Sequence, residues 1–207
     1  MGLLTLKLLN IWRIISSMVT ERNAEFFDII KNRLTPKRLY HSICVAEKAK
    51  HLAEKYGSNA EKAYTAGLVH DIMKNEPVEE MLRLIENDGQ VLTENEKAIT
   101  VTLHAIAGEV YLRKNLNVTD EELLSAVRWH TTGKEDMSLF EKIIYVADLV
   151  SDDREYPDAD EVRQLAEENL DKTLLRGLSF TIEDNAKKYK LIHTDTVKAY
   201  NYLICNH

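Results

Sequence analysis

A histidine and an aspartate stand side by side at the end of an apolar run in this chain. Residues 66–69 read Ala-Gly-Leu-Val, and His70 and Asp71 follow them directly. Burying an unpaired carboxylate costs several kcal/mol, so a buried aspartate needs a cation or a hydrogen-bonded partner. Any fold of this chain must therefore supply a partner to Asp71, and a divalent metal ion shared with other side chains would be one.

The composition predicts one helical globular domain. Glycine (7) and proline (3) are scarce among the 207 residues, which favours long helices over a turn-rich β fold. The formal charge of -7 gives no general surface for polyanions, so we expect no nucleic-acid partner. Cys44 and Cys205 lie far apart and form no disulfide framework, which fits a reducing cytoplasmic location.

Residues 1–17 stand apart from this pattern because they are rich in leucine and isoleucine and only Lys7 and Arg13 are charged. They are too few for a membrane span, which takes about 20 apolar residues, and they lack the basic start of a signal peptide. Three interpretations remain: an extra amphipathic helix, a membrane-surface anchor, or residues that precede a true start at Met18. We interpret residues 1–17 as an accessory or artefactual extension and residues 18–207 as a single domain, with no membrane association.

Helical spacing of apolar residues runs through the rest of the chain and indicates no strand. The fold class is therefore predicted as all-α. The expected helices cover residues 22–33, 36–56, 60–70, a short stretch after Pro77, a stretch that begins at Thr93 and carries Val101 and His104, a stretch from Asp120 to about His130, and residues 138–150, 160–188 and 193–205.

Six metal-binding side chains fall within or at the ends of these expected helices: His41, His70, Asp71, His104, His130 and Asp148. One histidine on an apolar helix face is usually a hydrogen-bonded core residue, but six such groups together favour a metal site. Four imidazoles and two carboxylates can hold two divalent ions such as iron, manganese or zinc, with Asp71 as a bridge. The three remaining histidines, His51, His193 and His207, are interpreted as surface or incidental.

Several motifs carry a resemblance to a known family. They are Tyr40-His41 with Val45-Ala46, residues 66–74, His104 with Gly108, the Trp-His-Thr-Thr-Gly run at 129–133, Met137-Ser138-Leu139, and the Lys-Ile-Ile-Tyr-Val-Ala-Asp run at 142–148. Over about residues 20–200 the chain resembles the HD-domain metal-dependent phosphohydrolase superfamily, whose pattern is H…HD…D. More narrowly, it resembles the bacterial YqeK family of symmetrical bis(5'-nucleosyl)-tetraphosphatases.

The resemblance implies a helical bundle around a buried dinuclear centre, with iron as the expected metal. Residue by residue, it implies that one metal is held by His41, His70, Asp71 and Asp148. The other metal is held by His104 and His130, with Asp71 as the bridge. The implied reaction is hydrolysis of diadenosine tetraphosphate into two ADP by a metal-activated water.

Further residues are candidates for contacts to the phosphates. Lys74 and Arg154, with Asp71, are predicted as catalytic, and the two cations as phosphate ligands. Thr131, Thr132 and Gly133 are predicted to offer hydroxyl and backbone donors, although they could simply end a helix. Family members often carry a Glu-Pro-x-Arg stretch after the last aspartate, whereas residues 149–157 keep Arg154 without the Glu-Pro pair. The resemblance therefore does not extend to the details of this loop.

Two other functions stay open at this stage. One is an HD phosphohydrolase that acts on nucleoside mono- or triphosphates or on cyclic nucleotides. The other is a nucleotide-binding sensor with low turnover, which an intact ligand set argues against. The expected partner is a nucleotide or dinucleoside polyphosphate, and a homodimer is left open as an oligomeric state.

Overall fold

The computed structural model describes residues 21–206, and this part of the chain is helical throughout, without a strand. The extension predicted at residues 1–17 lies outside the described residues, as does His207. The helices are α2 (Glu21–Arg33), α3 (Pro36–Tyr56), α4 (Ala60–Val69), α5 (Val78–Asn87), α6 (Glu94–Ala98), the 3-10 helix η1 (Thr100–Thr102), α7 (Leu103–Asn115), α8 (Glu121–Trp129), α9 (Leu139–Val150), α10 (Ala159–Glu168), α11 (Leu170–Lys187) and α12 (Thr194–Cys205). The all-α class predicted from the sequence is confirmed.

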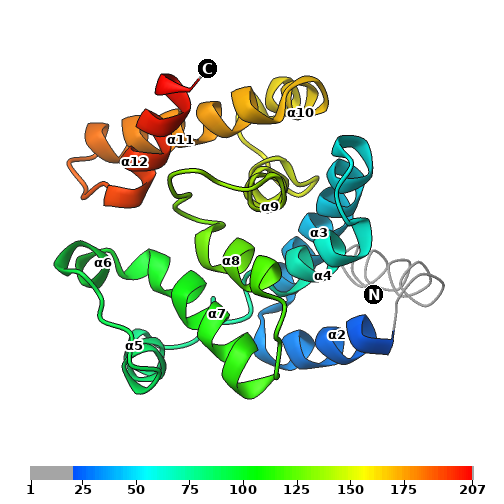
Figure 1. The fold of residues 1–207 in the computed structure, drawn as a ribbon, viewed down its shortest axis with the longest axis vertical. Helices are drawn as coiled ribbons and strands as arrows, with labels where there is room; N and C mark the ends of the chain where they lie inside the picture. The colour runs from blue at the N-terminus through cyan, green and yellow to red at the C-terminus, as the bar shows by residue number, and fades with distance from the viewer. Residues whose placement is uncertain (1–20, 207) are drawn as a thin grey trace.

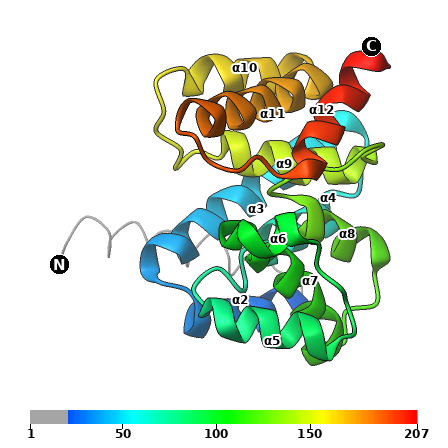
Figure 2. The ribbon, with the colours of Figure 1, turned by 90° about the vertical axis from the view of Figure 1, so that its left-hand side faces the viewer.

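Helix α9 lies in the middle of the molecule, between two groups of helices. Figures 1 and 2 show α10, α11 and α12 on one side of it, and α2 to α8 on the other. It contacts α3, α4 and α8 in the larger group and α10 and α11 in the smaller one. A buried hydrophobic cluster runs from Phe26 in α2 to Leu203 in α12 and passes through α9. Residues on opposite faces of α9 therefore reach different parts of the fold.

Local sequence signals set several of the helix ends. The Thr35 side chain accepts a hydrogen bond from the Arg38 N–H, and Pro36 stands at the first helical position of α3. At the other end of α3, Gly57 adopts a φ of 77°, a left-handed conformation that glycine takes without strain. Ser138 and Glu141 form a capping box at the start of α9. These signals explain why the predicted boundaries of α3 and α9 agree with the structure.

Two long helices expected from the sequence are each broken in the structure. The stretch from Thr93 to Asn115 is divided at Ile99, where φ is -102° and ψ is 67°, into α6, η1 and α7. Val101, expected on a helix face, is 73% exposed as a result. The stretch 160–188 is divided at Asn169, whose extended backbone begins α11 and whose side chain caps the Lys172 N–H.

One expectation about an individual residue was wrong. His193 was interpreted as a surface or incidental residue, but only 5% of it is exposed, because it stands at the start of α12 against α6. Within the described residues, no helix combines the length and the apolar character needed to cross a bilayer.

Helix α4 approaches α3 closely because Gly67 has no side chain. A Cβ at this position would lie 2.8 Å from the Ala46 Cα and 2.9 Å from its nitrogen, both of them backbone atoms. Backbone atoms cannot move aside as the end of a flexible side chain can. This contact fixes α4 against α3 just before the His70-Asp71 pair.

We expect Gly67→Ala to destabilise the protein by about 1–3 kcal/mol, because the added methyl must push the two helices apart. Urea unfolding followed by circular dichroism measures the change. Gly108→Ala in α7 is the matched control, since its Cβ would meet the nearest side chain at an ordinary 3.4 Å. Equal stability of the two variants would contradict the role given to the α3–α4 contact.

Candidate metal centre

Five helices bring the six predicted ligands to one place. His41 lies in α3 and Asp148 in α9, while His104 lies in the first turn of α7. The His70-Asp71 pair directly follows α4, and His130 directly follows α8. The four histidines and Asp71 are each at most 4% exposed. Groups of three of these residues offer ligand atoms that all lie within 4.8 Å of one another.

The two oxygens of Asp71 face two different pairs of imidazoles. Oδ1 lies 3.1 Å from His104 Nε2 and 3.6 Å from His130 Nε2. Oδ2 lies 3.5 Å from His70 Nε2 and 4.0 Å from His41 Nε2. A carboxylate with one oxygen toward each pair has the arrangement of a bridge between two cations.

Three of the imidazoles are oriented by the same local device. The Nδ1 of His70 lies 2.7 Å from the Gly67 carbonyl oxygen, and those of His104 and His130 lie 2.8 and 2.7 Å from the oxygens of Val101 and Val127. A carbonyl oxygen can only accept a hydrogen bond, so each Nδ1 carries the ring proton and is the donor of that bond. Each Nε2 is left with a lone pair that points into the site, which is the form of histidine that binds metals.

His41 is held differently, by carboxylates on both ring nitrogens. Its Nδ1 lies 2.8 Å from Asp153 Oδ2, and its Nε2 lies 2.9 Å from Asp148 Oδ1. Burial lowers the pKa of His41, but hydrogen bonds to Asp148 and Asp153 raise it more, and the net shift is upward. A carboxylate on the outer nitrogen of a ligand histidine orients the ring and increases the basicity of the inner nitrogen.

The chemistry of these atoms fits a divalent cation. With their Nδ1 atoms protonated, His104 and His130 direct two acceptor Nε2 atoms at each other across 3.3 Å. The Nε2 of His70 and Oδ1 of Asp71 are buried and make no hydrogen bond within the described part of the chain. Buried acceptors that face one another are unfavourable unless a positive charge lies among them.

Burial keeps two of the imidazoles, those of His70 and His104, in the neutral form that a metal requires. It lowers the pKa of His70 and lowers that of His104 to about 4. Burial alone would raise the pKa of Asp71, but the surrounding groups, with His70 first, hold it well below its usual range. Ligands in these protonation states bind divalent ions without first losing a proton.

Three cationic side chains surround the centre. Arg38 Nη1 donates to Asp71 Oδ2 over 2.9 Å. Lys74 Nζ lies 3.1 Å from His104 Nε2 and 4.0 Å from Asp71 Oδ1. Arg154 donates from Nε to the Asp148 backbone carbonyl and from Nη2 to its carboxylate. The predicted residues Lys74 and Arg154 therefore both lie at the centre.

The Thr-Thr-Gly run after His130 is only partly directed at the centre. The Thr131 hydroxyl lies 3.0 Å from His130 Nε2 and 3.3 Å from His104 Nε2. The Thr132 hydroxyl instead donates to the Gly133 carbonyl, and the Gly133 N–H donates to the Trp129 carbonyl. Of the donors predicted in this run, the hydroxyl of Thr131 is the one that lies beside the ligand histidines.

Sequence reasoning missed Arg38 and Asp153. Arg38 precedes His41 by three residues on α3, so the two share a helix face, and this spacing was a signal for it. Asp153 lies shortly after Asp148 in the sequence, in the loop that follows α9. The general need of a ligand histidine for an acceptor on its outer nitrogen was a reason to look for a carboxylate of this kind.

A second group of ligand-type side chains consists of Glu96, His193 and Asp195. Glu96 already accepts hydrogen bonds from Thr93 and from Arg128. The His193 Nδ1 accepts the Asp195 N–H at the start of α12. The Arg128–Glu96 bond ties α8 to α6, and Asn95 of α6 is hydrogen-bonded to Ile192 and Thr194 at the start of α12, so the group has a structural role.

Comparison with known proteins identifies the family. The family model described as HD domain matches residues 38–153, which is more than half of the chain and includes all six predicted ligands. The chain therefore belongs to the HD-domain family, whose members are metal-dependent. The buried histidines and aspartates described above are groups able to hold that metal.

Relatives within this family match almost the whole chain. A protein of Bacillus subtilis (strain 168) named "Bis(5'-nucleosyl)-tetraphosphatase, symmetrical" is 36% identical over 178 residues, 84% of this chain and 94% of the relative. A protein of the same name from Halalkalibacterium halodurans is 36% identical over 179 residues, 85% of this chain and 94% of that relative. The resemblance to the YqeK-type tetraphosphatases stated from the motifs is confirmed.

A solved structure agrees with the fold. It is described as a predicted HD superfamily hydrolase involved in NAD metabolism, from Clostridium acetobutylicum. Its TM-score is 0.87 at 38% sequence identity, and the match covers 89% of this chain and 97% of that one. The helical arrangement around the centre is therefore shared with a protein whose structure was determined.

We expect Asp153→Asn to weaken metal binding by about 10- to 100-fold, because His41 loses the carboxylate that orients it. Metal titration into the metal-free protein measures the affinity. Asp152→Asn is the matched control, since the Asp152 side chain is 74% exposed and pairs with Lys48 at 3.2 Å. Equal affinities in the two variants would show that Asp153 does not act on the centre.

Proposed function

We propose that this protein hydrolyses diadenosine tetraphosphate (Ap4A) symmetrically, so that one water and one Ap4A give two ADP. The observation that carries the proposal is the bridging position of Asp71, with one oxygen toward each pair of imidazoles. The names of relatives that are 36% identical over most of the chain support the substrate. Hydrolysis within the polyphosphate requires only water as a co-reactant.

The proposed cofactor is a pair of divalent ions, with iron as the first candidate and manganese or zinc as alternatives. His41, His70, Asp71 and Asp148 would hold one ion, and His104 and His130, with the second oxygen of Asp71, would hold the other. This mixture of imidazole and carboxylate ligands suits all three metals. Such ions act as Lewis acids and lower the pKa of a bound water, and hydrolysis of a phosphoanhydride needs both effects.

The protein's own charges at the centre nearly cancel. Asp71, Asp148 and Asp153 are negative, and they are matched by three cations, Arg38, Lys74 and Arg154. The charge of bound metal would thus remain uncompensated by the protein. A positive, largely buried site in a chain of net charge -7 attracts a polyphosphate locally.

We assign three side chains to binding the phosphates. Arg154 and Arg38 are each about one-third exposed, and each has N–H donors that no group among residues 21–206 accepts, beyond those used on Asp148 and Asp71. Lys74 supplies a compact positive charge beside His104. Burial lowers the pKa of Lys74, and a bound phosphate would favour its charged form again. We assign these cations to neutralising the charge that develops on the departing ADP.

The remaining sequence predictions belong to this proposal. Residues 18–207 would act as one phosphohydrolase domain, which the continuous core from Phe26 to Leu203 supports. The homodimer, the cytoplasmic location and the absence of a nucleic-acid partner stay predictions. None of them alters the chemistry proposed for the centre.

Metal-loaded protein, purified without oxygen, is expected to convert Ap4A into ADP alone, and Asp71→Asn is expected to abolish both this activity and part of the metal content. The amide cannot bridge two cations as a carboxylate does. Chromatography of the products and elemental analysis give the two readouts.

Other products would contradict the symmetric reaction. ATP with AMP would show an off-centre cut, and rapid hydrolysis of nucleoside triphosphates or cyclic nucleotides without Ap4A cleavage would favour the broader HD phosphohydrolase. NAD belongs in the same substrate panel, because the Clostridium acetobutylicum relative is described as involved in NAD metabolism. Tight nucleotide binding with no turnover would instead indicate a sensor.

Lys74→Ala is expected to lower kcat for Ap4A by about 100-fold while the metal content stays unchanged, because the lysine balances charge in the transition state and is not a ligand. Lys97→Ala is the control, since Lys97 pairs with Glu94 on the exposed side of α6. A fall in metal content equal to the fall in kcat would assign Lys74 to the structure of the centre instead.

A further inference from the structure

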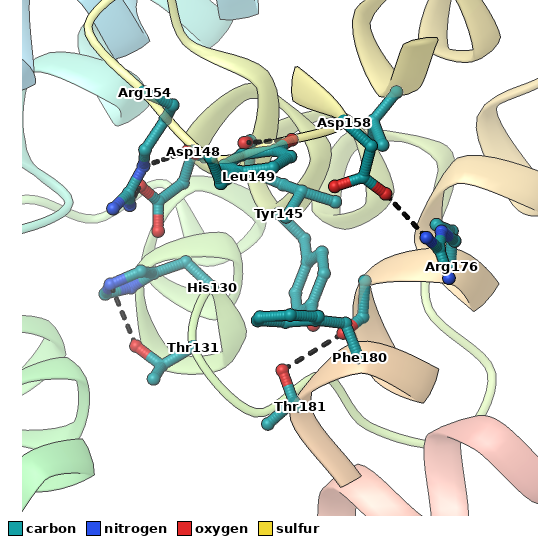
Figure 3. Close-up of a pocket in the computed structure, with 13 residues that line it drawn as sticks. His130, Thr131, Tyr145, Asp148, Leu149, Arg154, Asp158, Arg176, Phe180 and Thr181 are labelled. Atoms are coloured by element: carbon teal, nitrogen blue, oxygen red, sulfur yellow. Dashed lines mark hydrogen bonds and ion pairs between the residues drawn. The ribbon is translucent and has the colours of Figure 1, made fainter. Parts of the chain in front are cut away.

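The three cations at the metal centre are held in different ways. Figure 3 shows Arg154 against Asp148, at the edge of a cavity of about 260 Å³ that opens beside the centre between α9, α10 and α11. Arg38 pairs with Asp71 over 2.9 Å. Lys74 does not line the cavity, and its Nζ lies 4.0 Å from Asp71 Oδ1, the longest of these three ion pairs. The position of the Lys74 ammonium is therefore only weakly fixed by its carboxylate partner.

The contact between Lys74 and His104 does not fix the lysine either. Its Nζ lies 3.1 Å from His104 Nε2, and that nitrogen is one of the proposed ligand atoms. In the metal-loaded protein the lone pair of His104 Nε2 would not be free to hold the lysine. Lysine carries its charge on a flexible four-carbon stem. What places this ammonium is therefore the backbone that carries it.

Lys74 stands in an irregular segment between two helices. Helix α4 ends at Val69 and α5 begins at Val78. Between them, the N–H groups of Lys74 and Glu76 donate to the carbonyls three residues earlier in the chain, over 2.8 and 3.1 Å. Single turns of this kind are marginally stable by themselves. Residues 72–76, which we call the Lys74 segment, therefore need contacts from the rest of the fold.

Arg33, the last residue of α2, makes several of these contacts. It donates from Nε to the Ile72 carbonyl over 3.4 Å and from Nη2 to Glu76 Oε1 over 2.7 Å, so it contacts both ends of the Lys74 segment. Its Nη1 donates to the Tyr111 hydroxyl of α7 over 3.0 Å, and its guanidinium carbon lies 4.2 Å from the centroid of that ring. A guanidinium can make these contacts together because its donors form a rigid, planar fork. Arg33 thereby joins the Lys74 segment to α7.

The second half of the Lys74 segment depends most on polar contacts. Its first two residues, Ile72 and Met73, belong to the buried hydrophobic cluster. The next three are polar and reach the surface. Besides Arg33, the Thr35 N–H at the start of α3 contacts this half, because it donates to Asn75 Oδ1 over 2.9 Å.

The charge of Arg33 is balanced by its own partner. Glu76 pairs with it over 2.7 Å, and both side chains are less than one-third exposed. The charged groups that act most strongly on the Lys74 ammonium are instead Asp71, Arg38, Asp148 and Arg154. An effect of Arg33 on Lys74 would therefore pass through the backbone of the segment.

We propose that Arg33 is a positioning residue, which holds the Lys74 segment so that the Lys74 ammonium stays beside Asp71 and His104. The inference rests on the proposed function for the part that Lys74 plays in the reaction. Misplacing a catalytic group by about 1 Å can lower a rate by about 100-fold. Loosening the segment would thus slow the reaction without removing any group that touches the substrate or the metal.

Arg33→Lys tests the proposal while it keeps the positive charge. A lysine cannot contact Ile72, Tyr111 and Glu76 together, so we expect kcat for Ap4A to fall by about 10-fold while the metal content stays unchanged. In the Lys74→Ala background the same substitution should change kcat by less than about 2-fold, because its effect passes through Lys74.

Arg22→Lys is the matched control for this cycle. Arg22 lies in the same helix, is exposed, and has its guanidinium carbon 5.6 Å from the centroid of the Phe26 ring. We expect it to leave kcat unchanged in both backgrounds.

Hydrogen exchange followed by NMR tests the same contacts without catalysis. In Arg33→Lys, the amides of Lys74 and Glu76 are expected to exchange about 10-fold faster than in the wild type, as the loss of one hydrogen bond to a charged group would give. The amides of α9 should keep their exchange rates.

The outcomes separate this inference from the proposed function. Unchanged kcat or unchanged exchange in Arg33→Lys would overturn the inference. So would an undiminished loss of kcat in the Lys74→Ala background, or a fall in metal content that matches the fall in kcat. If exchange is faster in Arg33→Lys but the wild-type protein does not cleave Ap4A, the hold of Arg33 on the segment stands and the proposed reaction falls.

Discussion

The buried carboxylate of Asp71 is the constraint on which the rest of this structure depends. Burying this carboxylate costs several kcal/mol unless positive charge and hydrogen-bond donors surround it. Arg38 of α3 meets part of that requirement, because it donates to Oδ2. Helix α3, helix α7 and the end of α8 also direct the Nε2 atoms of His41, His104 and His130 at the carboxylate. The helices that carry the other predicted ligands pack around Asp71. A metal shared by its two oxygens would complete the arrangement, since the imidazole nitrogens nearby are acceptors and not donors.

The orientation of those imidazoles comes from helix ends. His70 and His130 each follow the last residue of a helix, where carbonyls lack partners within the helix. Their Nδ1–H groups satisfy the carbonyls of Gly67 and Val127. One bond therefore completes the helix end, fixes the tautomer and directs Nε2 inward. His104 makes the same bond at the start of a helix, since it lies in the first turn of α7 and its Nδ1 donates to the carbonyl of Val101 in η1.

Periodicity predicted the helices and the six candidate ligands because both depend on local spacing. It could not predict the break at Ile99, since residues 93–115 contain no proline and the divided conformation is stabilised by contacts with the rest of the fold. Asn169 did carry a signal, because its side chain is a common N-cap and does cap Lys172. His193 looked incidental because its charged neighbours Glu96 and Arg128 are far away in the sequence. The direction of the Thr132 hydroxyl depends on a single rotamer, which sequence patterns do not encode.

Helix α9 contributes both to the metal centre and to the cavity beside it. Asp148 of α9 points toward the other ligands. Tyr145 and Leu149, which also belong to α9, line the cavity next to α11. Helix α11 approaches this surface at Gly177, where a Cβ would lie 2.7 Å from Leu149 Cδ2 and 3.2 Å from Tyr145 Cε1. The floor of the cavity thus depends on the docking of α11, while the ligands depend mainly on α3, α4, α7 and α8. Substitutions in α11 can therefore change the shape of the cavity without displacing the groups that would hold the metal.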